Sequence, residues 1–249
     1  MEKQTTITPE SAAKEILDDR FPNASVMFLA GSLVRGEATR FSDLDLVVIF
    51  DKVEKAYRES FYYRGWPVEA FVHDAQTLNY FFDEVDKNCG VASLPHMVLE
   101  GKVISAPNEL SAKLKELAQK IVDAGPPMLE QSELDKRRYH ITDLIDDIRE
   151  PRSRAELMGS GAQLLNVLAD FYFRANGKWS ASGKTIFRKL GAADVKMQKE
   201  FEFAFSELFA EANSVPCIEL AEKVLKDKGG FLFDGYRSDA PADWRKRES

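Results

Sequence analysis

One stretch of the chain decides its fold: Gly31-Ser32-Leu33-Val34-Arg35-Gly36-Glu37-Ala38-Thr39-Arg40-Phe41-Ser42-Asp43-Leu44-Asp45-Leu46-Val47-Val48-Ile49-Phe50. It contains a glycine–serine turn, a short polar segment and a run of strand character that begins with two aspartates. The apolar run 25–30 precedes it and has the length of a strand. We therefore predict the order strand, turn, short helix or loop, strand.

The two aspartates, Asp43 and Asp45, lie two positions apart in the second predicted strand. Residues two apart in a strand point to the same side, so both carboxylates share one face while Leu44 and Leu46 point to the other. Two neighbouring carboxylates repel each other unless a cation lies between them. Mg²⁺ prefers oxygen ligands of this kind and usually completes its shell with water and substrate phosphates.

The turn at Gly31 and Ser32 provides the second half of the pattern. A turn that leads into a helix start offers free backbone N–H groups and a hydroxyl group to phosphate oxygens. Together with the two aspartates, this turn predicts a site for a metal ion and a triphosphate.

Residues 31–46 form a sequence motif that resembles the one in the nucleotidyltransferase fold of the DNA polymerase beta superfamily. The motif reads Gly-Ser-x-x-Arg-Gly-x-Ala-x-x-x-Ser-Asp-Leu-Asp-Leu. It is most similar to the small-substrate branch, which includes aminoglycoside adenylyltransferases such as kanamycin nucleotidyltransferase. The motif covers about 20 of the 249 residues, so it indicates the chemistry better than the substrate.

Glu69 is an acid inside an apolar strand that is predicted to follow Pro67. A charge in such a strand is costly unless it has a partner. The resemblance implies a third carboxylate on the strand beside the Asp-x-Asp strand, and Glu69 matches that position by order and context. The alternative is an edge-strand glutamate that faces water. His73 lies four residues further on, and we expect it near the surface at the end of the strand.

The resemblance implies the chemistry of nucleotidyl transfer. A hydroxyl of an acceptor attacks the α-phosphate of a nucleoside triphosphate, most simply ATP, and pyrophosphate leaves. Asp43 and Asp45 would hold one Mg²⁺ ion, and Glu69 would hold a second ion or act as the general base on the hydroxyl. The acceptor would be a small molecule, with aminoglycoside-like antibiotics as one class, and would lie between two domains.

Residues for the triphosphate come from two parts of the chain. In the first, Gly31 and Ser32 are expected to hold phosphate oxygens, and Arg35 either assists them or pairs with a surface acid. In the second, the chain resembles an Asn-x-x-Trp...Lys segment of the same branch, in which a lysine reaches the triphosphate. Lys184 is the candidate there, with Arg188 one turn further on, and the alternative is that both are solvated surface cations.

The expected fold class is α+β, with a small mixed sheet flanked by helices and then an antiparallel helical bundle. The proposed limits are a nucleotidyltransferase domain at 1–106, a bundle at 107–233 and a polar, loosely ordered tail at 234–249. Residues 55–63 are expected to be helical or irregular. Helical spacing and end signals predict helices at 8–20, 74–87, 109–124, 132–149, 153–175, 194–213 and 216–228.

Composition limits the function classes. The formal net charge of −7 argues against a protein that binds a nucleic-acid backbone, although it would suit a cationic acceptor. Cys89 and Cys217 lie far apart and form no metal or redox motif, so we expect reduced thiols in a cytoplasmic protein. The first residues lack the apolar core of a signal peptide, and no apolar run is long enough to cross a membrane.

Two other functions stay open. One is the same chemistry with a protein acceptor, as in nucleotidyltransferase antitoxins, although the long helical half speaks against it. The other is a nucleotide-binding module without catalysis, which the presence of all three acids makes less attractive. The sequence does not indicate the acceptor, the preferred nucleotide or the oligomeric state.

Overall fold

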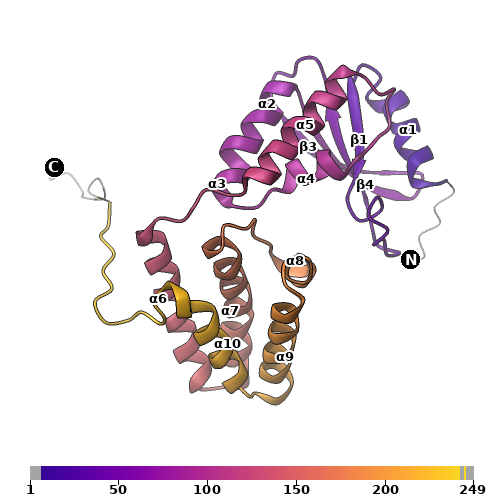
Figure 1. The fold of residues 1–249 in the computed structure, drawn as a ribbon. Coiled ribbons are helices and arrows are strands. Elements are labelled where there is room, and N and C mark those ends of the chain that lie inside the picture. The colour runs from indigo at the N-terminus through magenta and orange to yellow at the C-terminus, as the bar shows by residue number, and fades with distance from the viewer. Residues whose placement is uncertain (1–6, 242–243, 245–249) are drawn as a thin grey trace, which may run out of the picture. The chain divides into compact units, whose positions relative to one another are not determined.

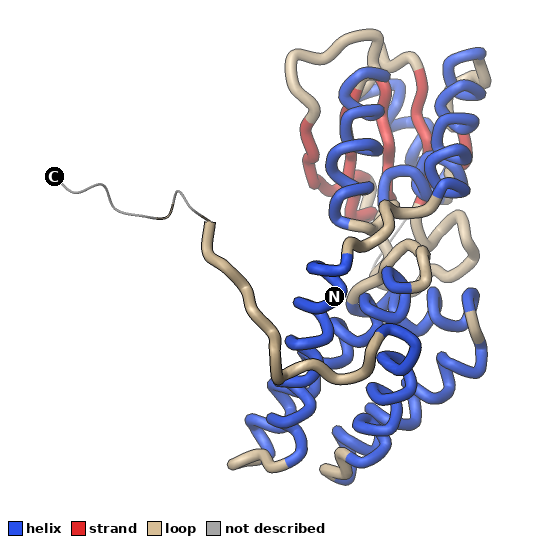
Figure 2. The backbone as a smooth tube through the Cα atoms, turned by 60° about the vertical axis from the view of Figure 1, so that its left-hand side comes forward, coloured by secondary structure: helices blue, strands red, loops and turns tan. Residues whose placement is uncertain are grey.

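The computed structural model describes residues 7–241 and residue 244. The chain divides into two compact units, Met1–Pro126 and Pro127–Ser249. The first combines a sheet with helices and the second is helical, so the predicted α+β class is confirmed (Figures 1 and 2).

The first unit is built on a five-stranded sheet in the order β3-β4-β2-β1-β5. Strands β2 and β4 run parallel, and the other neighbouring pairs run antiparallel. The sheet is therefore mixed, as predicted. The strand bounds are β1 Val26–Ala30, β2 Leu44–Ile49, β3 Tyr57–Tyr63, β4 Trp66–His73 and β5 Lys102–Val103.

Helices cover both faces of this sheet (Figure 1). On one face, α1 (Pro9–Arg20) packs its buried residues against strand residues such as Leu46 and Val48. On the other face, α2 (Ala75–Tyr80), α4 (Ser93–Glu100) and α5 (Glu109–Ala124) pack against strand residues such as Val47 and Ile49. Successive residues of β2 thus point into different cores, as the two-residue period of a strand requires.

The helix starts predicted near residues 8 and 74 are confirmed, and each has a capping side chain. Thr8 Oγ1 accepts a hydrogen bond from the Ser11 N–H at the start of α1. Asp74 accepts one from the Thr77 N–H at 2.8 Å, and the Thr77 hydroxyl completes the box by accepting from the Asp74 N–H. Helix α2 continues through a π-helical turn, Phe81–Asp86, and a final turn, α3 (Lys87–Cys89).

The prediction for residues 55–63 is wrong, because Tyr57–Tyr63 forms strand β3 at the edge of the sheet. It pairs antiparallel with β4 through a two-residue turn at Arg64 and Gly65. Both residues have positive φ angles, 45° and 84°, which is the backbone of a type I′ hairpin turn. An aromatic-rich run that ends at a glycine turn before a second strand carries the signal for such a hairpin.

The boundary predicted at residues 106 and 107 lies before α5, whereas the observed division lies after it. Leu114 and Ala118 of α5 are buried in the same core as Phe28 and Val47 of the sheet. The amphipathic pattern of α5 correctly predicts a helix, but it does not specify which apolar surface the helix covers.

The second unit contains α6 (Gln131–Arg149), α7 (Arg154–Ala175), α8 (Ile186–Ala193), α9 (Val195–Glu211) and α10 (Val215–Leu225). Helix α7 carries a long series of buried residues, including Leu164, Leu168 and Phe171. These contact a core that also contains Phe201 and Phe205 of α9. None of the helices among the described residues combines the length and apolar character needed to cross a membrane.

The chain that follows α10 packs against α6, and it includes Tyr236 at the start of the predicted tail. The Arg138 guanidinium group donates hydrogen bonds to the carbonyl oxygens of Gly229 and Gly230 at 2.6 and 2.8 Å. The ring of Tyr236 stacks on Tyr139 with their centroids 4.2 Å apart. Residues 242–243 and 245–249 of the predicted tail lie outside the described residues, as do the first six residues of the chain.

Candidate metal and nucleotide site

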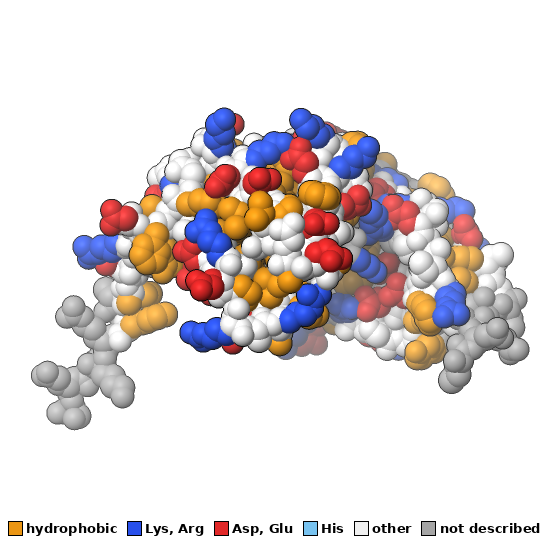
Figure 3. Space-filling view, turned by 90° about the horizontal axis from the view of Figure 1, so that it is seen from below, with side chains coloured by type: hydrophobic (Ala, Val, Ile, Leu, Met, Phe, Trp, Pro, Cys, Tyr) orange, Lys and Arg blue, Asp and Glu red, His pale blue; other side chains and the backbone are white. Residues whose placement is uncertain are grey.

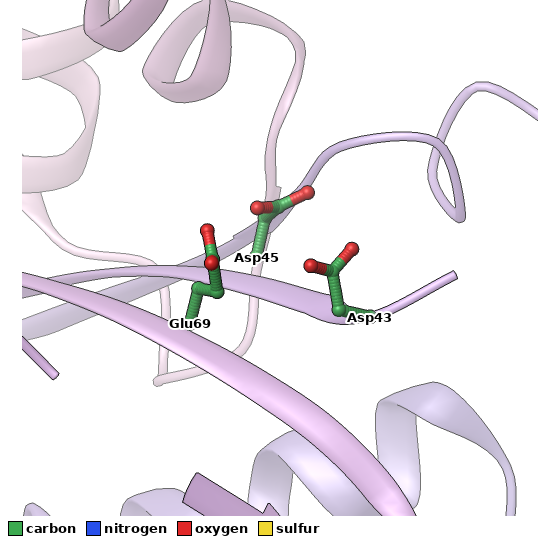
Figure 4. Close-up of side chains that lie close together, drawn as sticks. All are labelled: Asp43, Asp45 and Glu69. Atoms are coloured by element: carbon green, nitrogen blue, oxygen red, sulfur yellow. The ribbon is translucent and has the colours of Figure 1, made fainter. Parts of the chain in front are cut away.

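Three acidic side chains converge at one end of the sheet (Figure 4). Asp45 and Glu69 are partners in the register of the parallel strands β2 and β4, and Asp43 lies just before β2. One carboxylate oxygen from each residue lies within 4.8 Å of the other two. Figure 4 shows the three carboxylates projecting to the same side of the strands. The predicted neighbourhood of these residues is therefore observed.

The donor set fits a hard divalent cation. Mg²⁺ binds oxygen at about 2.0–2.1 Å, so two ligand atoms on opposite sides of one ion are roughly 4.2 Å apart. The observed spread of up to 4.8 Å needs only a small contraction to reach this value. All three residues are half-buried, which leaves room for water or substrate oxygens in the remaining positions.

The acids begin two rows of side chains on the sheet that continue with buried or half-buried apolar residues, Val47 after Asp45 and Phe71 after Glu69. Asp45 lies on the same face as Val47, and Glu69 lies on the same face as Phe71, because these residues are two apart along their strands. Val47 is fully buried under the helices of that face. The carboxylates therefore begin where the apolar core ends.

His73 occupies the end of the same row and is not near the surface, as we had expected. It is only 3% exposed and packs edge-on against Phe81, with the ring centroids 4.9 Å apart. Burial lowers the pKa of His73, and the neighbouring charge of Asp74 opposes this effect. His73 is thus a neutral core residue rather than part of the acidic site.

Gly31 allows Asp45 to approach the turn. Its φ angle is +78°, a conformation that favours glycine. A Cβ atom at this position would lie 1.9 Å from Asp45 Oδ2 and 2.9 Å from Asp45 Cγ, so the Asp45 side chain would have to move. The glycine therefore suits both the backbone conformation and the observed place of the carboxylate.

Ser32 follows Gly31 and is connected to the aspartate end of the motif. Its hydroxyl group donates a hydrogen bond to Ser42 Oγ at 3.0 Å. Residues 31–36 form a series of turns, and the Glu37 N–H donates to the Ser32 carbonyl oxygen at 2.9 Å. Of the two alternatives for this segment, helix or loop, the described residues 31–42 show the loop.

Arg35 pairs with acids, which is one of the two roles expected for it. Its guanidinium group contacts Glu37 at 3.0 Å and Glu100 of α4 at 3.3 Å. Partial burial acts to lower its pKa, but the hydrogen bond to Glu37 and the charge of Glu100 raise the pKa above the usual arginine value. A role on the triphosphate would require Arg35 to exchange these partners.

Arg58 is the site neighbour that sequence reasoning missed. Arg58 lies in β3, and its guanidinium group forms an ion pair with Glu69 of the adjacent strand β4. It also lies over the ring of Phe71, 5.2 Å from the centroid. The omission follows directly from the wrong prediction for residues 55–63, because only a strand at that position brings Arg58 beside β4.

Lys184 and Arg188 belong to the second unit. Lys184 is an exposed residue of a short 3₁₀ turn, Gly183–Thr185, and Arg188 lies in α8. Within the described part of the chain, Lys184 forms no ion pair. Their contact with a triphosphate stays a prediction.

The comparison with protein families decides the identity of the fold. The model of the nucleotidyltransferase domain matches residues 10–147, which is more than half of the chain. The chain belongs to the nucleotidyltransferase domain family. This match spans the glycine–serine turn and all three acids of the nucleotidyltransferase unit and ends within α6. It does not distinguish the small-substrate branch from others.

The two other comparisons do not indicate a substrate. No curated protein matches the chain. Among solved structures, a nucleotidyltransferase-like protein from Exiguobacterium sibiricum is similar over 89% of this chain and 76% of its own, with 17% sequence identity and a TM-score of 0.42. So distant a likeness carries no argument about substrate.

Proposed function

We propose that the protein transfers a nucleoside monophosphate, AMP from ATP, onto a hydroxyl group of a small molecule in a metal-dependent reaction. The observation that carries this proposal is the convergence of Asp43, Asp45 and Glu69 beside the turn at Gly31. Membership of the nucleotidyltransferase family supports the reaction class. The adenylyl preference, the magnesium requirement and the acceptor are parts of the proposal. The expected cytoplasmic location stays a prediction.

The reaction forms one bond and breaks another at the α-phosphorus. The acceptor oxygen bonds to this phosphorus, the bond to the bridging oxygen of the leaving group breaks, and pyrophosphate departs. Divalent ions, when bound, neutralise phosphate charge and lower the pKa of the attacking hydroxyl. Asp43 and Asp45 supply the carboxylate oxygens that hold them, and Glu69 supplies a third ligand or accepts the hydroxyl proton.

The triphosphate is positioned by the turn and by cations. The N–H groups at Gly31 and Ser32 are suited to phosphate oxygens, as is the Ser32 hydroxyl group. We assign supporting roles to Arg35, Lys184 and Arg188. Positioning and charge neutralisation account for most of the catalysis of such transfers, so few residues suffice.

The acceptor proposed here is a hydroxyl-bearing cation of the aminoglycoside type, which would make the activity one of antibiotic resistance. Helices α6 and α7 carry exposed carboxylates that suit a cationic acceptor, namely Asp143, Asp146, Asp147 and Glu156. Figure 3 shows acidic and basic side chains intermixed on the face that it displays, so the charge of −7 is not confined to one patch there.

A labelling experiment tests this function. The protein is incubated with α-³²P-ATP, Mg²⁺ and pools of hydroxyl-bearing small molecules or lysate proteins, and an Asp45→Asn variant serves as the matched control. The proposal predicts label in a small product, pyrophosphate release and loss of both in the variant. Label on a protein would identify a protein acceptor instead. Nucleotide binding without pyrophosphate release under all conditions would contradict catalysis.

A further inference from the structure

Arg58 has a defined place beside the acidic site. It is the register partner of Phe71 across the antiparallel pair β3–β4, so it lies on the sheet face that also carries Glu69. Its Nη2 atom contacts Glu69 Oε1, and its guanidinium group lies over the Phe71 ring. Both contacts come from strand residues, so the pairing of β3 with β4 places the guanidinium group beside the carboxylate.

The contact between Arg58 and Glu69 offsets part of the negative charge of the acidic site. Three carboxylates within 4.8 Å of one another repel each other when no cation is bound. Arg58 supplies one positive charge, which lies beside Glu69. A carboxylate has two oxygen atoms that accept from different directions, so the contact at Oε1 leaves Oε2 for another partner.

We propose that Arg58 is a positioning residue that limits how strongly Glu69 engages a metal ion. This inference rests on the proposed function, because it takes Asp43, Asp45 and Glu69 as the metal ligands. The guanidinium group and a divalent ion compete for the same negative charge, and they also repel each other. Removal of the Arg58 charge therefore tightens the binding of the ion, and a lysine at this position preserves the restraint.

The chain provides a matched control in Arg20. Its guanidinium group lies 4.0 Å from the centroid of the Phe61 ring and pairs with Glu59 of β3 at 2.7 Å. Phe61 belongs to the core beneath α1, on the sheet face opposite to the acids. Arg20 thus repeats the chemistry of Arg58, a guanidinium group over a phenylalanine ring and beside a glutamate, away from the acidic site.

The test is a Mn²⁺ titration without nucleotide, in which electron paramagnetic resonance measures the free ion. The variants are Arg58→Gln, Arg58→Lys, Arg20→Gln and Asp45→Asn, each checked for a cooperative thermal transition. We expect Arg58→Gln to bind Mn²⁺ about fivefold to tenfold more tightly than the wild type, because a repelling charge is removed at short range. Arg58→Lys and Arg20→Gln are expected to stay within about twofold of the wild type.

Two outcomes overturn the inference while the proposed function stands. One is Mn²⁺ affinity in Arg58→Gln that is unchanged or weaker. The other is an equal gain in Arg20→Gln, which would indicate a general effect of charge. A third outcome would contradict the proposed function itself. If the wild type binds Mn²⁺ no better than Asp45→Asn, the acids hold no ion, and the inference about Arg58 fails together with the proposed function.

Discussion

The carboxylate of Asp45 fills the space beside Gly31 that a side chain would need. A Cβ atom at Gly31 would lie 1.9 Å from Asp45 Oδ2. The glycine of the turn and the second aspartate of the strand are therefore one structural unit, although 13 positions separate them in the sequence. This contact explains why the motif needs both its glycine and its spacing.

Gly31→Ala is expected to weaken the metal site. The added methyl group would displace the Asp45 carboxylate, so Mn²⁺ affinity and pyrophosphate release should both fall by roughly tenfold to a hundredfold, the range for the loss of a group that orients a metal ligand. Gly36→Ala is the matched control, because Gly36 also has a positive φ angle, +72°, but a Cβ atom there would meet nothing within 4 Å. Both variants bear the backbone cost of about 1 kcal/mol or more for a left-handed residue, which thermal unfolding will report. Equal Mn²⁺ binding in the two variants would argue against the contact.

Glu69→Gln separates binding from chemistry. The amide keeps the shape of the side chain but loses the charge and the capacity to accept a proton. We expect turnover to fall at least about a hundredfold, the range for a lost general base, while ATP binding stays nearly intact. Single-turnover kinetics and equilibrium ATP binding measure the two quantities separately. Normal turnover would remove Glu69 from the mechanism.

Lys184→Ala tests the contribution of the second unit. Loss of a cation from a triphosphate should raise the KM for ATP by roughly tenfold, in the range for a charge-assisted hydrogen bond. It should leave Mn²⁺ binding without nucleotide unchanged. Lys199→Ala, which removes an exposed lysine of α9, is the control. If the two variants have the same KM for ATP, Lys184 is a solvated surface cation.

Asp86 gives a pH-dependent stability that is independent of the proposed function. Burial raises its pKa from the usual 3.8 to about 6, although the Leu94 N–H, which donates to Asp86 Oδ2 at 2.9 Å, acts in the other direction. Between pH 4 and 6 the folded chain therefore holds a proton that the unfolded chain has lost. By linkage, this residue makes the protein less stable as the pH rises through that window, by at most about 3 kcal/mol.

The measurement for Asp86 is denaturant unfolding at several pH values. We expect Asp86→Asn to flatten the fall in the free energy of unfolding between pH 4 and 6 relative to the wild type. Glu84→Gln, at an exposed position on the same helical segment, should keep the wild-type slope. The slope is the readout because the amide at position 86 can also change the stability by a constant amount. An unchanged slope in Asp86→Asn would contradict a raised pKa.

The sequence is informative where local chemistry sets the structure. The caps at Thr8 and Asp74 and the strand around Asp45 follow from short-range hydrogen bonding and from the two-residue period. The pairing of Asp45 with Glu69 required the family resemblance, because register between strands is a long-range property. Such a property cannot be read from either strand alone.

The failures have a physical cause in common. Strand β3 is an edge strand whose side chains are mostly exposed or half-exposed, so its sequence lacks a strong apolar alternation. Because strand β3 was not predicted, the contact of Arg58 with Glu69 of the neighbouring strand β4 could not be predicted either. The position of α5 was missed for a similar reason: an apolar stripe shows that a helix is covered, but it does not specify by which core.

The most direct test of a metal and nucleotide site at the three acids is a crystal structure of the protein with Mn²⁺ and a non-hydrolysable ATP analogue, with the ion located by its anomalous scattering. We predict an anomalous peak within about 2.4 Å of carboxylate oxygens from Asp43 and Asp45, with a phosphate oxygen in the same coordination shell. Glu69 should face the same ion or a second one nearby. Nucleotide bound elsewhere, or a fully bound analogue with no ion at these acids, would contradict it.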